Sequence, residues 1–397
     1  MSENLMKQEI ENRLHQFLTV MNQDNPDWDT AIILSRVNQY YFTGTMQDGL
    51  LLIKRDGTAS YFARRSFERA QAESPMTNIF PMESYRDAAK IVGASCGVTY
   101  LETEVTTIGI LERLKKHFNM ESIKSLDRVI LSIRAVKSSY EITQIEQCGK
   151  QHDNLLMTVV PTLLQAGMSE ADLVGRLFDK MVQYGYQGLA RFSMFQNEMV
   201  VGQIGFGESS IYPTSFDGPG GAYGMSPAAP FLGSREKKLK KGDLVFVDIA
   251  FAMNGYHSDK TQVYLFGAEP SQEMIETHRA CLELQSRLAK QLKTGAIPSE
   301  IYNKEIDALS PEFLQNFMGF GARQVKFLGH GVGLHVDEMP VIANGFNSPL
   351  AENMVIALEP KKGIAGIGMV GVEDTYIVTA NGGRCITGGG RDIIVVG

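Results

Sequence analysis

The first third of the chain alternates between helical and strand-like spacing of apolar residues. Apolar positions that recur every three or four residues predict an amphipathic helix near the start, at Ile10, Leu14, Phe17, Leu18 and Met21. Short apolar runs predict strands at 31–34, 49–53 and 59–63 and near 99 and 125, and a further helix is expected over 108–117. Alternating helices and strands indicate a small N-terminal α/β domain.

A helix-start signal marks the beginning of a second domain. Ser138 and Glu141 stand three residues apart, as in a capping box, and predict the start of a long helix. We therefore divide the chain into an N-terminal domain, 1–134, and a C-terminal domain, 135–397. Further helices are expected from Ser169 and over 272–294 and 299–309, followed by strands. The whole chain is expected to be of the α/β (α+β) class.

Residues 191–234 show little periodicity and are rich in Gly, Pro and Ser. A loop of this length in a compact domain is usually functional or disordered. Its aromatic residues favour an ordered loop that helps to form a site.

Composition limits the classes of binding partner and the cellular compartment that we expect. The net charge of −7 argues against a nucleic-acid surface or an anionic membrane surface, which would need clustered Lys and Arg. The chain carries neither a signal-peptide pattern nor an apolar run of the ~18 residues that span a bilayer. Its four widely spaced cysteines give no disulfide framework, and we expect a cytoplasmic protein. Four histidines in helical stretches are expected to face solvent: His15, His117, His152 and His278.

Two aspartates lie on a predicted hairpin in the second domain. The apolar run 244–251 is interrupted only by Asp248, and Asn254-Gly255 is a strong hairpin signal. If these two residues form the turn, Asp248 lies opposite Thr261 and Asp259 shares its face as a diagonal neighbour. Two carboxylates on one buried face repel each other and lose hydration, so they require a cation.

The C-terminal segment repeats this arrangement. The apolar run 355–358 ends in Glu359, and the run 369–378 contains Glu373. A hairpin centred near Gly366 would place these two glutamates opposite each other. Four acids carried by strands are too many to be buried without neutralisation.

A histidine completes the set of candidate ligands. Glycines on both sides of His330 let the backbone pack closely and leave the imidazole free to reach inward. Taken singly, a strand Asp is more often an edge residue and a lone His more often packs than binds. Together, imidazole and carboxylates favour Mn, Fe, Co or Zn, and two ions that share bridging carboxylates explain the number of acids.

These residues resemble the motifs of the creatinase, aminopeptidase P and prolidase superfamily, which includes the methionine aminopeptidases. The stretches that carry the resemblance are 247–248, 254–261, 329–333, 358–360 and 372–375, together with 134–142 and the N-terminal Tyr41-Phe42-Thr43-Gly44. The resemblance covers essentially the whole chain.

The resemblance implies a pita-bread catalytic domain over 135–397 behind a small creatinase-like domain, in a protein that is usually a homodimer. It implies two divalent metal ions bridged by Asp259 and Glu373, with Asp248 completing one site and His330 and Glu359 the other. Glu359 would also be catalytic and would handle the proton of the attacking water.

Some positions depart from the superfamily pattern. The second His usually found seven residues beyond the ligand His is Asp337 here, and His335 is the candidate to replace it. The Arg usual two residues before the last Glu in prolidase-like members is Gly371, and residues 205–230 contain no His.

Three functions follow from these observations. The first is a dinuclear metallopeptidase of the Xaa-Pro dipeptidase or aminopeptidase type, acting on short peptides. The second is a related enzyme that hydrolyses a C–N bond of a small amide-like metabolite or eliminates from it. The third is a non-catalytic interaction module on the same fold.

Overall fold

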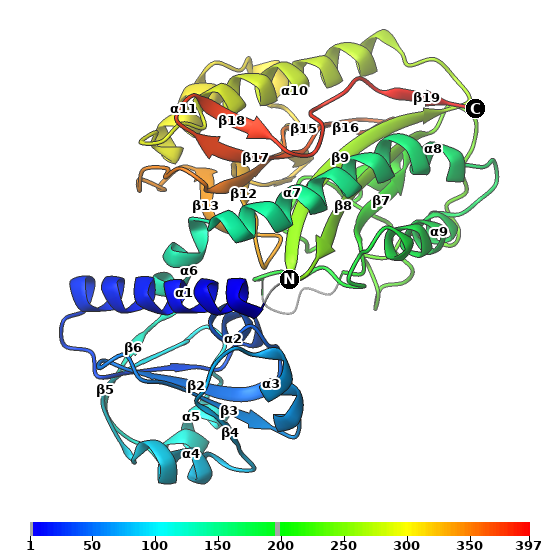
Figure 1. Ribbon diagram of the computed structural model, residues 1–397. Helices are drawn as coiled ribbons and strands as arrows, with labels where there is room; N and C mark the ends of the chain where they lie inside the picture. Colours follow the sequence, from blue (N-terminus) through cyan, green and yellow to red (C-terminus); the bar gives the residue numbers. More distant parts are fainter. Residues whose placement is uncertain (1–2, 195–198) are drawn as a thin grey trace. The chain divides into compact units, whose positions relative to one another are not determined.

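The structure is a computed structural model that describes residues 3–194 and 199–397 (Figure 1). The chain divides into two compact units, Met1–Arg134 and Ala135–Gly397. No helix within the described ranges is both long enough and apolar enough to cross a membrane.

The first unit is built on one mixed sheet with the strand order β4-β3-β2-β1-β5-β6. Its strands are β1 (Thr30–Ile33), β2 (Asp48–Lys54), β3 (Ala59–Arg64), β4 (Ile79–Pro81), β5 (Ser95–Leu101) and β6 (Asn119–Ser125). Its helices are α1 (Glu3–Asp24), α2 (Arg36–Thr43), α3 (Phe67–Glu73), α4 (Tyr85–Val92) and α5 (Ile108–Lys115), and α6 (Asp127–Ala135) follows. The predicted α/β pattern of this region is confirmed.

Both faces of this sheet are covered by helices (Figure 1). On one face Ile32, Leu50 and Phe62 pack against residues of α4 and α5. On the other, Phe17 of α1 meets the rings of Trp28 and Phe42 edge to face, at centroid distances of 5.9 and 5.4 Å. The predicted N-terminal amphipathic helix is therefore held by an aromatic cluster.

The second unit contains two larger sheets and two small ones. Its strands are β7 (Gly202–Phe206), β8 (Leu244–Met253), β9 (Tyr256–Phe266), β10 (Gly319–Phe320), β11 (Arg323–Gln324), β12 (Phe327–Gly331), β13 (Glu338–Ala343), β14 (Val355–Leu358), β15 (Lys361–Ile364), β16 (Gly368–Gly371), β17 (Asp374–Thr379), β18 (Gly382–Cys385) and β19 (Ile394–Val396). Strand orders are β19-β9-β8-β7 and β13-β12-β14-β17-β18, and β10-β11 and β15-β16 form pairs.

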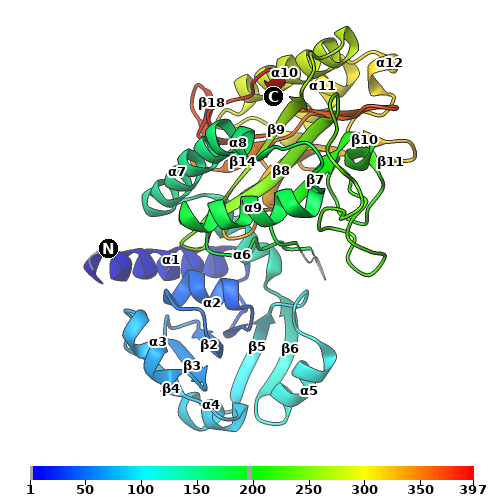
Figure 2. The same cartoon turned by 90° about the vertical axis from the view of Figure 1, so that its right-hand side faces the viewer.

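The helices and helical turns of this unit are α7 (Ser139–Asn154), the π-helical turn η1 (Leu155–Val159), α8 (Val160–Leu163), α9 (Glu170–Gln183), the 3₁₀ turn η2 (Gly207–Ile211), α10 (Gln272–Gln291), α11 (Pro298–Asp307) and α12 (Pro311–Leu314). The long helices α7, α9 and α10 lie outside the two larger sheets (Figures 1 and 2). The predicted capping box opens α7, because Glu141 N donates to Ser138 Oγ at 3.2 Å and Ser138 N donates to Glu141 Oε2 at 3.0 Å.

Strand alternation in β8 separates the core from the site. Val245, Val247, Ile249 and Phe251 pack in one cluster with residues of α7 and α9. Leu244 and Phe246 point the other way and pack with residues of β15 and β16. Asp248 has the parity of this second group and therefore lies on the face of β8 opposite α7 and α9.

Two expectations from the sequence are wrong. Part of the expected 191–234 loop is the regular strand β7, which pairs with β8; residues 195–198 of that loop lie outside the described residues. His152 and His278 are 0% and 1% exposed, so they do not face solvent. In both cases tertiary pairing or packing overrides a weak local pattern.

Candidate metal centre

The β8–β9 hairpin has the register expected from its turn. Met253 pairs with Tyr256, Asp248 with Thr261 and Ala250 with Asp259. Asp248 and Asp259 are each 8% exposed. The turn therefore brings both carboxylates to the same buried face, as predicted.

The C-terminal hairpin keeps the same pairing register on both sides of a break at the candidate ligands. Lys361 pairs with Gly371 in β15–β16, and Leu358 pairs with Asp374 in β14–β17, about the same centre. Between these pairs both strands break, at Glu359-Pro360 and at Val372-Glu373. The break leaves the carboxylates of Glu359 and Glu373 free to turn inward.

His330 sits in β12, where its glycine neighbours allow close backbone packing. A Cβ on Gly329 would collide with the carbonyl oxygen of Ala357, and one on Gly331 with that of Met339. The Nδ1–H of His330 donates to the carbonyl of Gly331 at 3.2 Å. This bond fixes the ring and directs Nε2 towards the acids, as ligating histidines are usually held.

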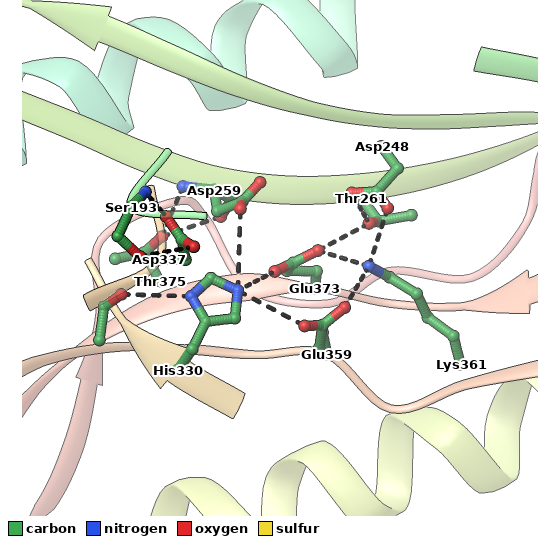
Figure 3. Close-up of polar contacts among 11 residues, drawn as sticks. Ser193, Asp248, Asp259, Thr261, His330, Asp337, Glu359, Lys361, Glu373 and Thr375 are labelled. Carbon is green, nitrogen blue, oxygen red and sulfur yellow. Dashed lines mark hydrogen bonds and ion pairs between the residues drawn. The ribbon is translucent and has the colours of Figure 1, made fainter. Parts of the chain in front are cut away.

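Four of the predicted ligands converge on the His330 side of the site (Figure 3). His330 Nε2 lies 3.9 Å from Asp259 Oδ2, 3.4 Å from Glu359 Oε1 and 3.6 Å from Glu373 Oε1. One ligand atom each from Asp259, His330 and Glu373 lies within 4.8 Å of the others, which suits a metal ion. Glu373 Oε1 is buried without a hydrogen-bond donor among the described residues, and a bound cation would satisfy this oxygen.

The electrostatics of the site also require positive charge. Burial raises the pKa of Asp248 to about 6, and repulsion from Glu373 adds to this although Lys361 opposes it. The pKa of Asp259 is raised well above its ordinary value by burial and by the charges of Glu373 and Asp248. Burial alone would lower the pKa of His330, but the nearby carboxylates of Glu359 and Glu373 raise it well above its ordinary value. A bound cation would relieve the mutual repulsion of these acids.

The sequence interpretation missed a lysine in the centre. Lys361 is 0% exposed, and its Nζ lies 3.0 Å from Asp248 Oδ2, 2.8 Å from Glu359 Oε2 and 2.5 Å from Glu373 Oε2 (Figure 3). A signal was present, because residue 361 follows Glu359 by two positions, the spacing that keeps side chains on one face of a strand.

A hydroxyl and a buried ion pair hold the ligand strands together. Thr261 Oγ1 lies 2.8 Å from Asp248 Oδ1 and 3.1 Å from Glu373 Oε2. Lys260, next to Asp259, pairs with Asp374, next to Glu373, at 2.6 Å with both side chains fully buried. Side chains alternate along strands, so this pair joins β9 to β17 on the side away from the ligands.

His335 and Asp337 do not lie on a strand, which corrects the argument that placed His335. β12 ends at Gly331 and β13 begins at Glu338, so strand alternation does not govern the segment between them. The main-chain N–H of His335 donates to Glu338 Oε1 at 2.8 Å. Asp337 accepts from Ser193 N at 2.7 Å and from Ser193 Oγ at 2.9 Å, and thereby anchors the start of the 191–234 segment.

Comparison with known proteins shows the family and the fold. Residues 143–380 match metallopeptidase family M24, and residues 13–136 match the creatinase/prolidase N-terminal domain. The Xaa-Pro dipeptidase of Pyrococcus horikoshii is 28% identical over 94% of this chain and 96% of its own length, and that of Pyrococcus furiosus is 26% identical over 97% and 100%. The crystal structure of the P. horikoshii prolidase, 25% identical, superposes with a TM-score of 0.78 over 96% of this chain and 100% of that one. The chain belongs to metallopeptidase family M24, and its second unit has the family's pita-bread fold.

Proposed function

We propose that the protein is a metal-dependent peptidase that cleaves dipeptides with proline after the scissile bond. The observation that carries the proposal is the convergence of Asp259, His330 and Glu373 on one point, where the buried Oε1 of Glu373 has no hydrogen-bond donor in the part of the chain that the structure describes. The full-length similarity to proteins named Xaa-Pro dipeptidase supports the substrate class.

The metal would be held by Asp259, His330 and Glu373, with Glu359 Oε1 beside them. A divalent ion bound there supplies Lewis acidity, which polarises a carbonyl and makes water a stronger nucleophile at neutral pH. The mixture of imidazole and carboxylate ligands suits Mn, Co, Zn or Fe, and the identity of the ion remains a prediction. The sequence predicts two ions.

Two side chains are proposed to act on the substrate. Glu359 lies at the edge of the cluster, 3.4 Å from His330 Nε2, where it can take a proton from water and return it to the leaving amine. His335 is proposed to steady the developing charge on the carbonyl oxygen. The test for His335 is that His335→Ala lowers kcat while the bound metal is unchanged.

A second candidate function is C–N bond cleavage in a small non-peptide metabolite. It is favoured by residues around the centre that differ from the superfamily pattern. Asp337, at the position of the usual second His, accepts hydrogen bonds from Ser193, and Lys361 lies within the acid cluster. A panel of Xaa-Pro dipeptides and proline-second peptides, assayed after manganese or cobalt loading, separates the two. Cleavage at ordinary enzymatic rates (about 1–10³ s⁻¹) supports the peptidase, and consumption of a metabolite mixture without peptide cleavage supports the alternative.

Ligand variants make the assay specific to this centre. His330→Ala and Asp259→Ala are expected to lose the bound metal and the cleavage activity together, because each removes a proposed metal ligand. Full activity in either variant would exclude this centre as the active site. We also propose a homodimer and a cytoplasmic location; sedimentation analysis of the purified protein tests the first and cell fractionation the second.

A further inference from the structure

The ammonium of Lys361 occupies the half of the acid cluster opposite His330 (Figure 3). Its three N–H donors face three carboxylate oxygens, one each from Asp248, Glu359 and Glu373, at 2.5–3.0 Å. The side chain is fully buried. The lysine therefore has the number of partners that an ammonium can satisfy.

The oxygens that a second metal ion would need are already in use. Asp248 Oδ2 accepts from Lys361, and Asp248 Oδ1 lies 2.8 Å from Thr261 Oγ1. A metal ion binds carboxylate oxygen at about 2.0–2.2 Å. An ion on Asp248 Oδ2 and Glu373 Oε2 would therefore overlap with the Nζ atom that lies 3.0 and 2.5 Å from them.

The other half of the cluster is bounded by the imidazole of His330 rather than by an ammonium. Glu359 and Glu373 each turn one oxygen to Lys361 and the other to His330. On the His330 side, Glu373 Oε1 has no hydrogen-bond donor among the described residues. The two glutamates thus connect a position filled by the protein to a position left for an ion.

The charge balance agrees with a single ion. Four carboxylates, those of Asp248, Asp259, Glu359 and Glu373, against one ammonium leave a formal charge of −3 when the imidazole is neutral. One divalent ion reduces this to −1. A second would bring the site to +1 and place an ion against a buried ammonium, which electrostatic repulsion opposes.

Local geometry also holds the lysine in place. Lys361 pairs across β15–β16 with Gly371, whose φ is +125°. A Cβ on Gly371 would lie 2.6 Å from Lys361 Cα and would collide with the carbonyl oxygen of Pro360. The absence of a side chain at Gly371 therefore allows the Lys361 backbone to pack closely against it.

We propose that Lys361 is a built-in cation that replaces one of the two metal ions, so that the centre binds a single divalent ion through Asp259, His330, Glu359 and Glu373. This inference rests on the metal centre of the proposed function and changes its stoichiometry from two ions to one. The charge of the missing ion is supplied by a side chain of the same chain.

The test is metal stoichiometry of the full chain by elemental analysis after loading with manganese or cobalt and desalting. We expect one equivalent for the wild type and two for Lys361→Ala, which removes both the charge and the volume. Lys361→Met, which keeps the volume, is expected to bind no more than one. Lys362→Ala is the matched control and should match the wild type, because Lys362 Nζ contacts the carbonyls of Phe313 and Gln315.

The outcomes separate this inference from the proposed function. Two equivalents in the wild type overturn the inference whether or not peptides are cleaved. One equivalent in Lys361→Ala, with a wild-type circular dichroism spectrum, also overturns it, because the lysine would not be what excludes the second ion. One equivalent in the wild type without cleavage of any peptide supports the inference and contradicts the peptidase. No metal in the loaded wild type contradicts both.

If Lys361→Ala fails to fold, a cobalt titration of the wild type followed by visible absorption still decides, since it should saturate at one equivalent.

Discussion

At the residue scale, the centre is a group of buried charges that satisfy one another only in part. Lys361 forms ion pairs with one carboxylate oxygen each of Asp248, Glu359 and Glu373. Glu373 Oε1 and His330 Nε2 point towards each other on the opposite side. Burying a charge without a partner is costly, so these acids need positive charge, which Lys361 supplies on one side and a metal ion would supply on the other.

A buried histidine outside the metal centre, His152, is expected to make stability depend on pH. His152 is fully buried in α7; its Nδ1 lies 3.0 Å from Ser258 Oγ, and its Nε2 has no hydrogen-bond partner among the described residues. Burial, and then the charge of Lys260, hold its pKa well below the ordinary value of 6.5. As pH falls through that value the unfolded chain binds a proton that the folded one refuses, so the free energy of unfolding should fall with pH.

The measurement is the urea unfolding midpoint of the wild type and of His152→Gln between pH 7.5 and about 5. Below about pH 6.5 the wild type should lose up to about 1.4 kcal/mol per pH unit more than the variant. Parallel curves would show that His152 is not the titrating group.

The same scale shows where sequence reasoning worked and where it did not. Asp248, Asp259, Glu359 and Glu373 were recognisable because an acid in an apolar strand is conspicuous. Lys361 was overlooked although it follows Glu359 by two positions, since a lysine before a glycine-rich turn usually lies in solvent. His152 was misjudged because its helix is buried on the face that carries it, and helical spacing alone does not say which partner covers a face.

At the element scale, two hairpins set the geometry of the centre. Their turns at Asn254-Gly255 and around Gly366 fix which residues stand opposite each other, so the β8–β9 register could be predicted from the sequence to the residue. The break of the second hairpin into two sheets at Glu359 and Glu373 could not, because it depends on pairing with β12.

The close packing of Gly331 in β12 against Met339 in β13 can be tested by adding a side chain at residue 331. Gly331→Ala should destabilise the protein by about 1–3 kcal/mol, because its Cβ has no room beside Met339. Metal affinity should fall about 10-fold or more, since the ring of His330 is held by the Gly331 carbonyl. Gly175→Ala in α9, which meets nothing within 4 Å, is the control and should raise stability by up to about 1 kcal/mol. Equal behaviour of the two variants would contradict the close-packing argument.

The Lys260–Asp374 pair is expected to fix the two ligand strands. Lys260→Met leaves Asp374 buried without its counter-ion and should cost about 3–5 kcal/mol in thermal or urea unfolding. Lys260→Met combined with Asp374→Asn should recover part of this loss. In the wild type Thr387 Oγ1 donates to Asp374 Oδ1 at 2.8 Å, and the amide oxygen of the variant can still accept this hydrogen bond. A double variant as unstable as the sum of the singles would show that the two residues act independently.

At the scale of the whole molecule, the proposed centre belongs entirely to the second unit. Its candidate ligands and Lys361 all lie within Ala135–Gly397, and that unit has its own apolar clusters. Its first residues are anchored within the unit, since Lys137 pairs with Glu338 at 3.3 Å between fully buried side chains.

Residues 135–397 produced alone should therefore fold and bind metal with the stoichiometry of the full chain. Circular dichroism and elemental analysis of the purified fragment test this. A fragment that is folded but metal-free would show that the first unit contributes to the site.

The lysine in the acid cluster has a consequence for how the protein depends on metal supply. A centre that needs two ions responds to the square of the free metal concentration when metal is scarce, whereas one that carries half of its positive charge on a side chain responds to the first power. Activation by manganese or cobalt should then follow a simple hyperbola, and a chelator should have one ion to remove. The ammonium held by Asp248, Glu359 and Glu373 cannot be chelated or diluted away. The protein would thus keep a partly neutralised, assembled centre in conditions of metal limitation that would leave a two-ion centre empty.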